Sequence, residues 1–174
     1  MTVDERNRLI ALYKEGPEKL RICLSTIPVE AFEYKPGPER WSIHEIVVHI
    51  IDSDLNSLMR FNGTIAEAGR ELPVYNQELW VAKLFTPQKT VPLCLNLLEA
   101  FREYNGILLD SVKEGDWKNS VVHPERGVIT LEKVLQMYTN HIHDHIKQIE
   151  KTHDTWQKQQ RGEYVDPDRS LIYI

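Results

Sequence analysis

The chain has 174 residues, of which 41% are hydrophobic, and this length suits one hydrophobic core. We therefore expect a single domain over residues 1–160, followed by an irregular tail over 161–174. The formal net charge of −5 offers no basic face of the kind that nucleic acids require, so we expect no nucleic-acid partner. The sequence has neither an apolar run long enough for a bilayer nor the basic and apolar segments of a secretory leader, which predicts a cytoplasmic protein without a membrane partner.

The first predicted helix runs from about Asp4 to Ile27 and has apolar residues along one side. Gly16 and Pro17 are expected to kink or interrupt this helix, because proline lacks the N–H group that a helix interior needs. Pro28 ends it, and the segment VEAFEYKPGPER that follows is expected to be a connector.

The second predicted helix has the clearest start in the sequence. Ser42 is followed three residues later by Glu45, which is the pattern of a capping box. In the sequence IHEIVVHIIDSDLNSLMRFNGTIAEAG that begins after Ser42, His49 lies beside the apolar stripe, so its ring can point into a core shared with another helix. His44 lies on a different face and is expected to be solvated.

The middle of the chain is less regular. A short helix is expected over residues 76–85, NQELWVAKLF. Thr86 and Pro87 have the pattern of a cap and a first-turn residue for a third long helix, from about Lys89 to Lys113. The next segment, GDWKNSVVHPERGV, is expected to be a loop in which His123 is exposed.

The fourth long helix is predicted to begin after Thr130 and to continue to about Gln159. His141 and His145 lie four residues apart within its apolar stripe, so the two rings are neighbours and both can reach one ion. Two buried rings without a metal would each need a separate hydrogen-bond partner, and that is the alternative interpretation of this pair.

Four long helices without persuasive alternating strands predict an all-α four-helix bundle. Such bundles build metal sites from side chains on facing helices, so His49 is the natural third ligand for His141 and His145. His143 is expected to face away from the stripe, and His153 is expected to lie near the exposed end of the helix.

Two stretches of the chain also carry a family resemblance. They are PERWSIHEIVVHIIDSD at the second helix and GVITLEKVLQMYTNHIHDHIKQI, with its H-x-x-x-H-x-x-Q-I pattern, at the fourth. Both resemble signatures of the DinB/YfiT-like superfamily of metal-dependent four-helix-bundle enzymes. The resemblance implies an up-down-down-up bundle, commonly a homodimer, and it places the metal triad of the family on His49, His141 and His145.

Three neutral imidazoles suit zinc, nickel or iron as a divalent ion and leave coordination positions open. Such an ion activates either a bound water or a substrate thiolate. We therefore expect a metal-dependent hydrolase or a thiol-dependent transferase acting on a small molecule, with a low-molecular-weight thiol as one candidate. The alternative is a non-catalytic, metal-stabilised bundle that acts in stress response or as an interaction module.

Two further residues are candidates for catalysis or for orienting a ligand. Asp52 lies three residues after His49, and Gln148 lies three residues after His145. A carboxylate or an amide at that position can accept a proton or fix the tautomer of the neighbouring ring. The alternative for each is an ordinary solvated side chain.

Overall fold

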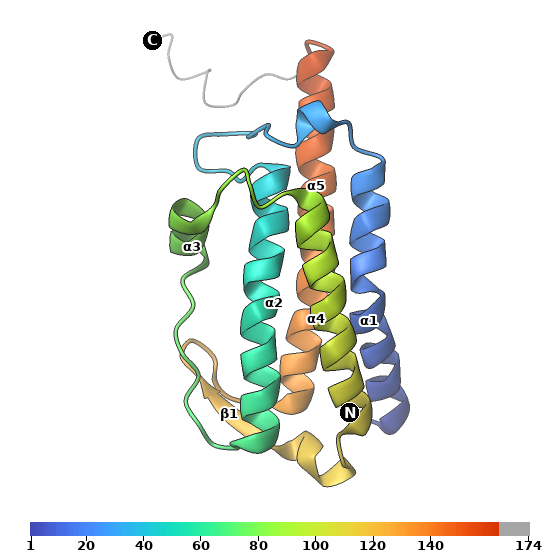
Figure 1. The fold of residues 1–174 in the computed structure, drawn as a ribbon, viewed down its shortest axis with the longest axis vertical. Coiled ribbons are helices and arrows are strands. Elements are labelled where there is room, and N and C mark those ends of the chain that lie inside the picture. Colours follow the sequence, from blue (N-terminus) through green and yellow to red (C-terminus); the bar gives the residue numbers. More distant parts are fainter. Residues whose placement is uncertain (164–174) are drawn as a thin grey trace.

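The computed structural model describes residues 1–163, and four long helices form most of it (Figure 1). They are α1 (Val3–Ser25), α2 (Ile43–Ala66), α4 (Val91–Ser111) and α5 (Leu131–Gln160). Helices α1 and α5 run one way along the bundle, and α2 and α4 run the other way, so the predicted all-α bundle of up-down-down-up type is confirmed. Most of the expected tail, from residue 164 onward, lies outside the described residues.

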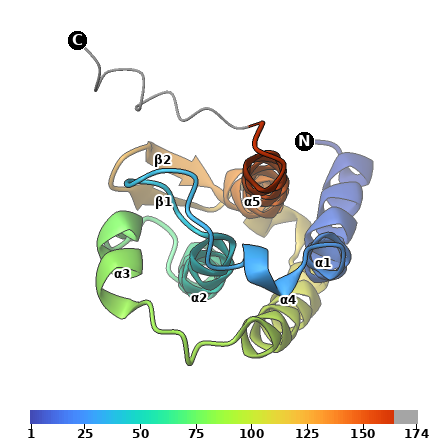
Figure 2. The same cartoon turned by 90° about the horizontal axis from the view of Figure 1, so that it is seen from above.

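Short elements join the long helices. Two 3₁₀ helices follow α1 and α4, an additional α-helix packs beside α2, and an antiparallel hairpin precedes α5: η1 (Val29–Ala31), η2 (Glu114–Lys118), α3 (Gln77–Leu84), β1 (Ser120–His123) and β2 (Gly127–Thr130). Seen from above, α3 and the hairpin lie on the same side of the bundle, next to α2 and α5 (Figure 2). None of the helices within residues 1–163 has an apolar segment that could cross a bilayer.

The hairpin corrects the prediction of a loop over residues 115–128, because that stretch contains η2 and β1. Val121 and His123 alternate with more exposed neighbours along β1 and are both buried. The prediction that His123 is exposed is therefore wrong. Its side of the strand faces the bundle, where it is 5% exposed.

Two helix starts differ in how well the sequence located them. At α2 the capping box is present: Oγ of Ser42 accepts from the backbone N–H of Glu45 at 3.2 Å, and the carboxylate of Glu45 accepts from the N–H of Ser42 at 2.8 Å. At α4 the predicted cap is wrong, because Thr90, not Thr86, is the N-cap, and Pro92 then falls within the first turn.

His44 is buried rather than solvated, since it is only 6% exposed. Its Nδ1 lies 2.7 Å from a carboxylate oxygen of Glu33, and its Nε2 lies 2.8 Å from the carbonyl oxygen of Lys89. The ring therefore ties the connector after α1 to the segment before α4. These partners are distant in sequence, so the helical period alone could not place them.

Helix α1 continues through Gly16 and Pro17, contrary to the predicted interruption. Pro17 has no N–H group, so the carbonyl of Tyr13, four residues earlier, lacks its usual helical donor. Nη1 of Arg102, on α4, donates to this carbonyl at 3.0 Å. Gly16 leaves room for the guanidinium, because a Cβ there would lie 2.5 Å from the same nitrogen. A neighbouring helix thus supplies the hydrogen bond that the proline removes.

Arg102 joins all four long helices. Its Nε and Nη2 donate to the two carboxylate oxygens of Asp54 on α2 at 3.1 and 3.2 Å, and Nη2 also donates to the carbonyl of Tyr138 on α5 at 3.1 Å. Burial raises the pKa of Asp54, and the charge of Arg102 opposes that rise. Two apolar clusters, one toward each end of the bundle, enclose this polar group.

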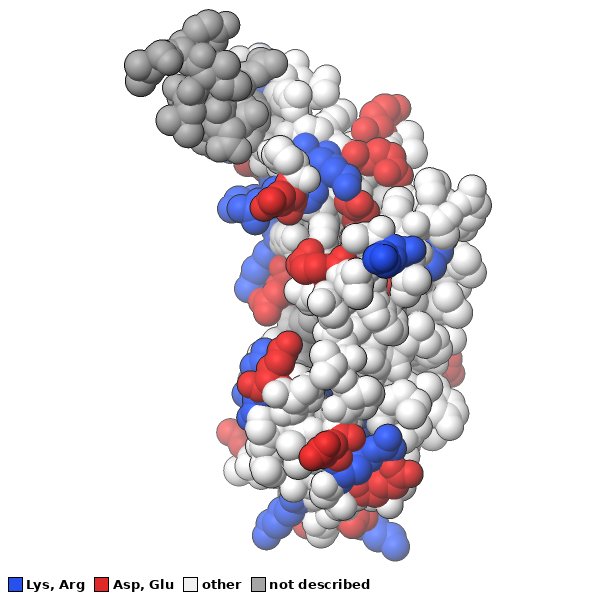
Figure 3. Space-filling model, turned by 90° about the vertical axis from the view of Figure 1, so that its left-hand side faces the viewer, with Lys and Arg blue, Asp and Glu red and all other residues white. Residues whose placement is uncertain are grey.

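The face that carries α3 and the hairpin has mixed charges (Figure 3). Lys and Arg side chains are interspersed with Asp and Glu, and no broad patch of one sign covers this face.

Candidate metal centre

Three imidazoles meet between α2 and α5. Nε2 of His49 lies 3.2 Å from Nε2 of His141 and 3.1 Å from Nε2 of His145, and the latter two nitrogens are 3.0 Å apart. His49 is fully buried, and the other two rings are partly buried. Among residues 1–163, this is the only group of histidine, cysteine or acidic side chains with the spacing of a metal site. The structure thus brings together all three candidate ligands from the sequence.

The second nitrogen of two rings is held by a hydrogen-bond partner. Nδ1 of His145 lies 2.8 Å from Oε1 of Gln148, which accepts from it, and Nδ1 of His49 lies 3.3 Å from the hydroxyl oxygen of Tyr75, which can accept from it. A neutral ring with its proton on Nδ1 presents a lone pair at Nε2. The lone pairs of His49 and His145 therefore point at a common position. Nδ1 of His141 is buried without a hydrogen bond.

Burial keeps these rings neutral. Burial, together with the neighbouring His145, lowers the pKa of His49 to about 3. The same causes lower the pKa of His141 well below its usual range, and burial also lowers that of His145, although its bond to Gln148 opposes the change. Neutral imidazole is the form that binds metals. Lone pairs at such close range repel one another, and a shared cation would remove that repulsion.

The spacing of the nitrogens fits a divalent cation. Zinc–nitrogen distances are about 2.0–2.1 Å, and two nitrogens at that distance with bond angles between octahedral and tetrahedral values lie about 2.8–3.4 Å apart. The separations of 3.0, 3.1 and 3.2 Å fall within this range. Three uncharged ligands would leave coordination positions open, as in catalytic sites rather than closed structural ones.

Two aromatic side chains form the wall behind His49. The ring of Trp41 lies 4.7 Å from that of His49 between centroids, and the ring of Tyr75 is stacked nearly parallel to it at 6.4 Å. Trp41 comes from the residue before the cap of α2. Tyr75 comes from the irregular segment before α3, where the sequence has no periodicity that could have placed it at the site.

Asp52 and Gln148, the two candidate catalytic residues, have different surroundings. Gln148 contacts a ring of the group, as described above. Asp52 is buried, so the interpretation of a solvated acid is wrong, and Tyr75, not Asp52, contacts Nδ1 of His49. One carboxylate oxygen of Asp52 lies 3.7 Å from Nζ of Lys89, and the other is buried without a hydrogen bond. Burial raises the pKa of Asp52, and Lys89 opposes that rise.

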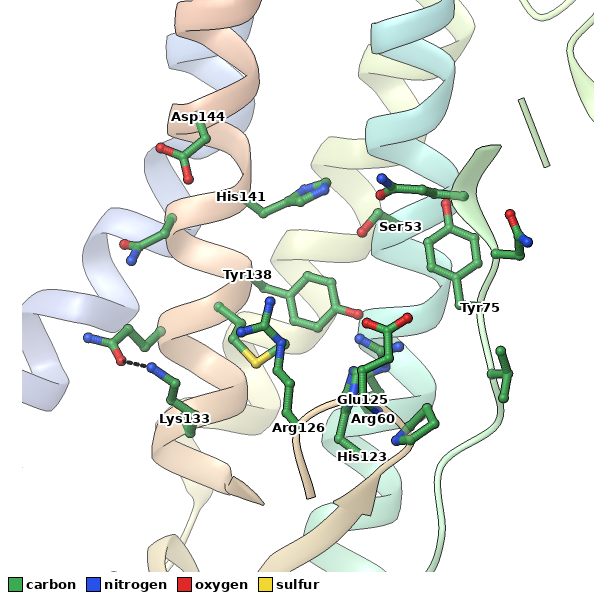
Figure 4. Close-up of a pocket in the computed structure, with 17 residues that line it drawn as sticks. Ser53, Arg60, Tyr75, His123, Glu125, Arg126, Lys133, Tyr138, His141 and Asp144 are labelled. Carbon is green, nitrogen blue, oxygen red and sulfur yellow. Dashed lines mark hydrogen bonds between the residues drawn. The ribbon is translucent and has the colours of Figure 1, made fainter. Parts of the chain in front are cut away.

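A cavity of about 710 Å³ lies beside the three histidines, between α2, α5 and the hairpin (Figure 4). Of the three, His141 is the one that lines it. Figure 4 shows Tyr138 extending from α5 across the cavity toward Arg60 of α2. His123 of the hairpin closes the side below Arg60. The cavity is large enough to hold a small molecule next to His141.

Comparisons with known proteins identify similar chains in Bacillus. The chain is 24% identical over 147 residues to the "Putative metal-dependent hydrolase YfiT" of Bacillus subtilis (strain 168), a match that covers 84% of this chain and 83% of that protein. It is 29% identical over 109 residues to a "Putative metal-dependent hydrolase" of Bacillus cereus (strain 03BB102), which covers 63% of this chain and 62% of the relative.

Solved structures support the fold. The structure of YfiT from Bacillus subtilis, described as having an unusual four-helix bundle topology, matches with a TM-score of 0.80 and 23% identity over 94% of this chain and 91% of that one. A mutant of the mycothiol-dependent maleylpyruvate isomerase matches with a TM-score of 0.64 and 13% identity over 86% of this chain and 61% of that one. The family model of the DinB superfamily matches residues 12–149, and the chain therefore belongs to the DinB superfamily.

Proposed function

We propose that this protein is a metal-dependent enzyme in which His49, His141 and His145 hold one divalent cation. The observation that carries the proposal is the convergence of three Nε2 atoms at 3.0–3.2 Å beside a cavity. The names of the relatives in Bacillus, which refer to metal-dependent hydrolysis, agree with it. Hydrolysis of a small molecule is therefore the first candidate reaction.

A cation bound there would supply Lewis-acid chemistry, polarising a substrate carbonyl or activating a water or a thiol. The protein's own groups have defined tasks around it. Gln148 and Tyr75 keep the protons of His145 and His49 on Nδ1, so that both Nε2 atoms stay free to bind. Asp52 acts through Tyr75, whose pKa is raised first by burial and then by this carboxylate, so the phenol keeps its proton.

Thiol-dependent group transfer is the second candidate reaction. One observation favours it: the bundle shares its fold with the mycothiol-dependent maleylpyruvate isomerase. In that case a low-molecular-weight thiol would be the co-substrate. Zinc and nickel suit three imidazoles best, and ferrous iron also accepts them. The third alternative is a bundle whose metal only stabilises the fold.

Metal analysis and a substrate screen test these alternatives together. The purified protein is loaded separately with zinc, nickel and ferrous iron, and its metal content is measured after dialysis. We expect close to one equivalent in the native protein and in His153→Ala, which changes a histidine of α5 outside the group. His141→Ala should keep its helical circular dichroism and lose the metal. A native protein that retains no metal would refute the proposal.

The loaded protein is then assayed with esters, amides and small thiols paired with electrophiles. Turnover of an ester or amide supports hydrolysis, whereas turnover that requires a thiol supports transfer. A stoichiometric metal that raises the melting temperature, with no turnover in any class, would support the non-catalytic alternative instead.

A further inference from the structure

Arg60 on α2 is a buried cation without a counterion. Its side chain lines the cavity and the residue is only 8% exposed. Arg102, the other deeply buried arginine of α2 and α4, is paired with Asp54 at 3.1 Å. No carboxylate in the described part of the chain forms an ion pair with Arg60. A buried charge is costly unless it is paired, so a missing partner points to a ligand.

The groups next to Arg60 are hydrogen-bond donors. The carbon at the centre of its guanidinium lies 5.8 Å from the centroid of the Tyr138 ring. The Tyr138 hydroxyl is buried with no hydrogen-bond partner within range, and burial raises its pKa against the opposing effect of Arg60, so it keeps its proton. Nδ1 of His123 accepts from the backbone N–H of Glu125 at 3.2 Å, which leaves the proton of the neutral ring on Nε2. The guanidinium, the phenol and the imidazole can all donate.

Further charged side chains line the outer part of the cavity. Arg126 and Lys133 line it together with two acidic residues, Glu125 and Asp144. With Arg60, the cavity therefore has three cationic side chains against two acidic ones. Glu125 is exposed, so solvent screens its charge, and this carboxylate does not prevent an anion from binding to Arg60. The buried donors and the positive excess both suit an anion.

We propose that the cavity binds the anionic group, a carboxylate or a phosphate, of a small-molecule substrate, with Arg60 as its principal partner. The anionic end of the substrate would lie at Arg60 and its reacting end would face His141. The position of the reacting end rests on the proposed function. The ring of Tyr138 links the two ends, because it lies 6.4 Å from the ring of His141 between centroids and beside Arg60. A short molecule therefore spans the distance from the anion site to the metal centre.

The first experiment uses hydroxamates, which bind open zinc sites. Straight-chain dicarboxylic acids from succinic to adipic acid, with one end converted to a hydroxamate, are compared by calorimetry with alkyl hydroxamates of equal length and with their phosphonate analogues. In the zinc-loaded protein, the best anionic compound should bind at least about tenfold more tightly than its alkyl match, because hydrogen bonds between charged groups are strong. The carboxylate and phosphonate series reveal which anion fits.

Arg60→Gln should abolish this gain and leave the affinity for alkyl hydroxamates unchanged, which also demonstrates that the variant folds. Arg60→Lys should keep part of the gain, because lysine retains the charge without the fork of donors. Arg21→Gln is the matched control, since it removes a positive charge from a surface pair with Glu99 outside the cavity, and it should keep the full gain.

The second experiment needs no metal. Melting temperatures of the metal-free protein are measured with inorganic phosphate or acetate, against chloride at equal ionic strength. Stabilisation by anions that is present in the native protein and lost in Arg60→Gln supports the anion site, even if no hydroxamate binds. A failure of all hydroxamates to bind would refute only the proposed metal centre. Alkyl hydroxamate binding with no effect of Arg60 on anions in either experiment would refute the anion site and leave the metal centre standing.

Discussion

Replacing Arg102 with methionine tests the polar network at the centre of the bundle. The change removes the hydrogen bonds to the Asp54 carboxylate and to the carbonyls of Tyr13 and Tyr138. Breaking a buried ion pair costs about 3–5 kcal/mol because the remaining charge is uncompensated, and each orphaned carbonyl adds about 1–3 kcal/mol. Since methionine fills part of the space, we expect a net loss of about 4–6 kcal/mol, which is a large share of the usual stability of about 5–15 kcal/mol.

Urea denaturation followed by circular dichroism measures this loss, provided that the m-value stays constant. Arg21→Met, at an exposed pair with Glu99, is the control and should cost less than about 1 kcal/mol. Adding Asp54→Asn to the Arg102 variant should restore part of the stability, because it removes the unpaired charge. If the Arg102 variant were no less stable than the surface control, the reasoning about this network would be wrong.

Three further predictions concern the close approach of α1 and α4, the hydrogen-bond partner of His49 and the effect of pH on stability. Gly16→Ala should lower the free energy of unfolding by roughly 1–3 kcal/mol in urea, because the new Cβ would lie 2.5 Å from Nη1 of Arg102; an unchanged value would contradict the close approach. Tyr75→Phe should weaken zinc binding by about 10–100-fold in a chelator competition at constant helix content, because it removes the hydroxyl at Nδ1 of His49. The metal-free protein should lose stability as the pH falls from 6.5 toward about 3, because in this window the unfolded chain takes up a proton that buried His49 does not. For this histidine, the free energy of unfolding should change by up to about 1.4 kcal/mol per pH unit. A melting temperature that stays constant across this pH range would refute the prediction.

Local patterns were enough to predict the framework of the site. The capping box of Ser42 and Glu45 acts within one helical turn, and the spacing of His141 and His145 fixes their common face without reference to other helices. The third member, His49, followed from the expectation that α2 faces α5. These features depend on helical geometry, which the sequence expresses directly.

Features that depend on tertiary partners could not be read in the same way. Pro17 predicts a break unless another helix supplies a donor, and only the fold brings Arg102 to that point. His44 and His123 resemble surface histidines until distant segments cover them. Tyr75 lies in an irregular segment, so no period indicates the direction of its side chain. Burial of these residues is decided by chain segments far away in sequence.

The position of the central guanidinium has a consequence for the metal centre. Asp54 lies five residues after His49 on α2, and Tyr138 lies three residues before His141 on α5, and Arg102 grips both. Because α2 and α5 run in opposite directions, these hydrogen bonds from Arg102 limit the sliding of one helix along the other. A slip of a single turn, about 5.4 Å, would pull the nitrogens out of reach of a common ion. Helix α4 contains no histidine, yet its Arg102 thus fixes the position along the bundle at which the three rings meet.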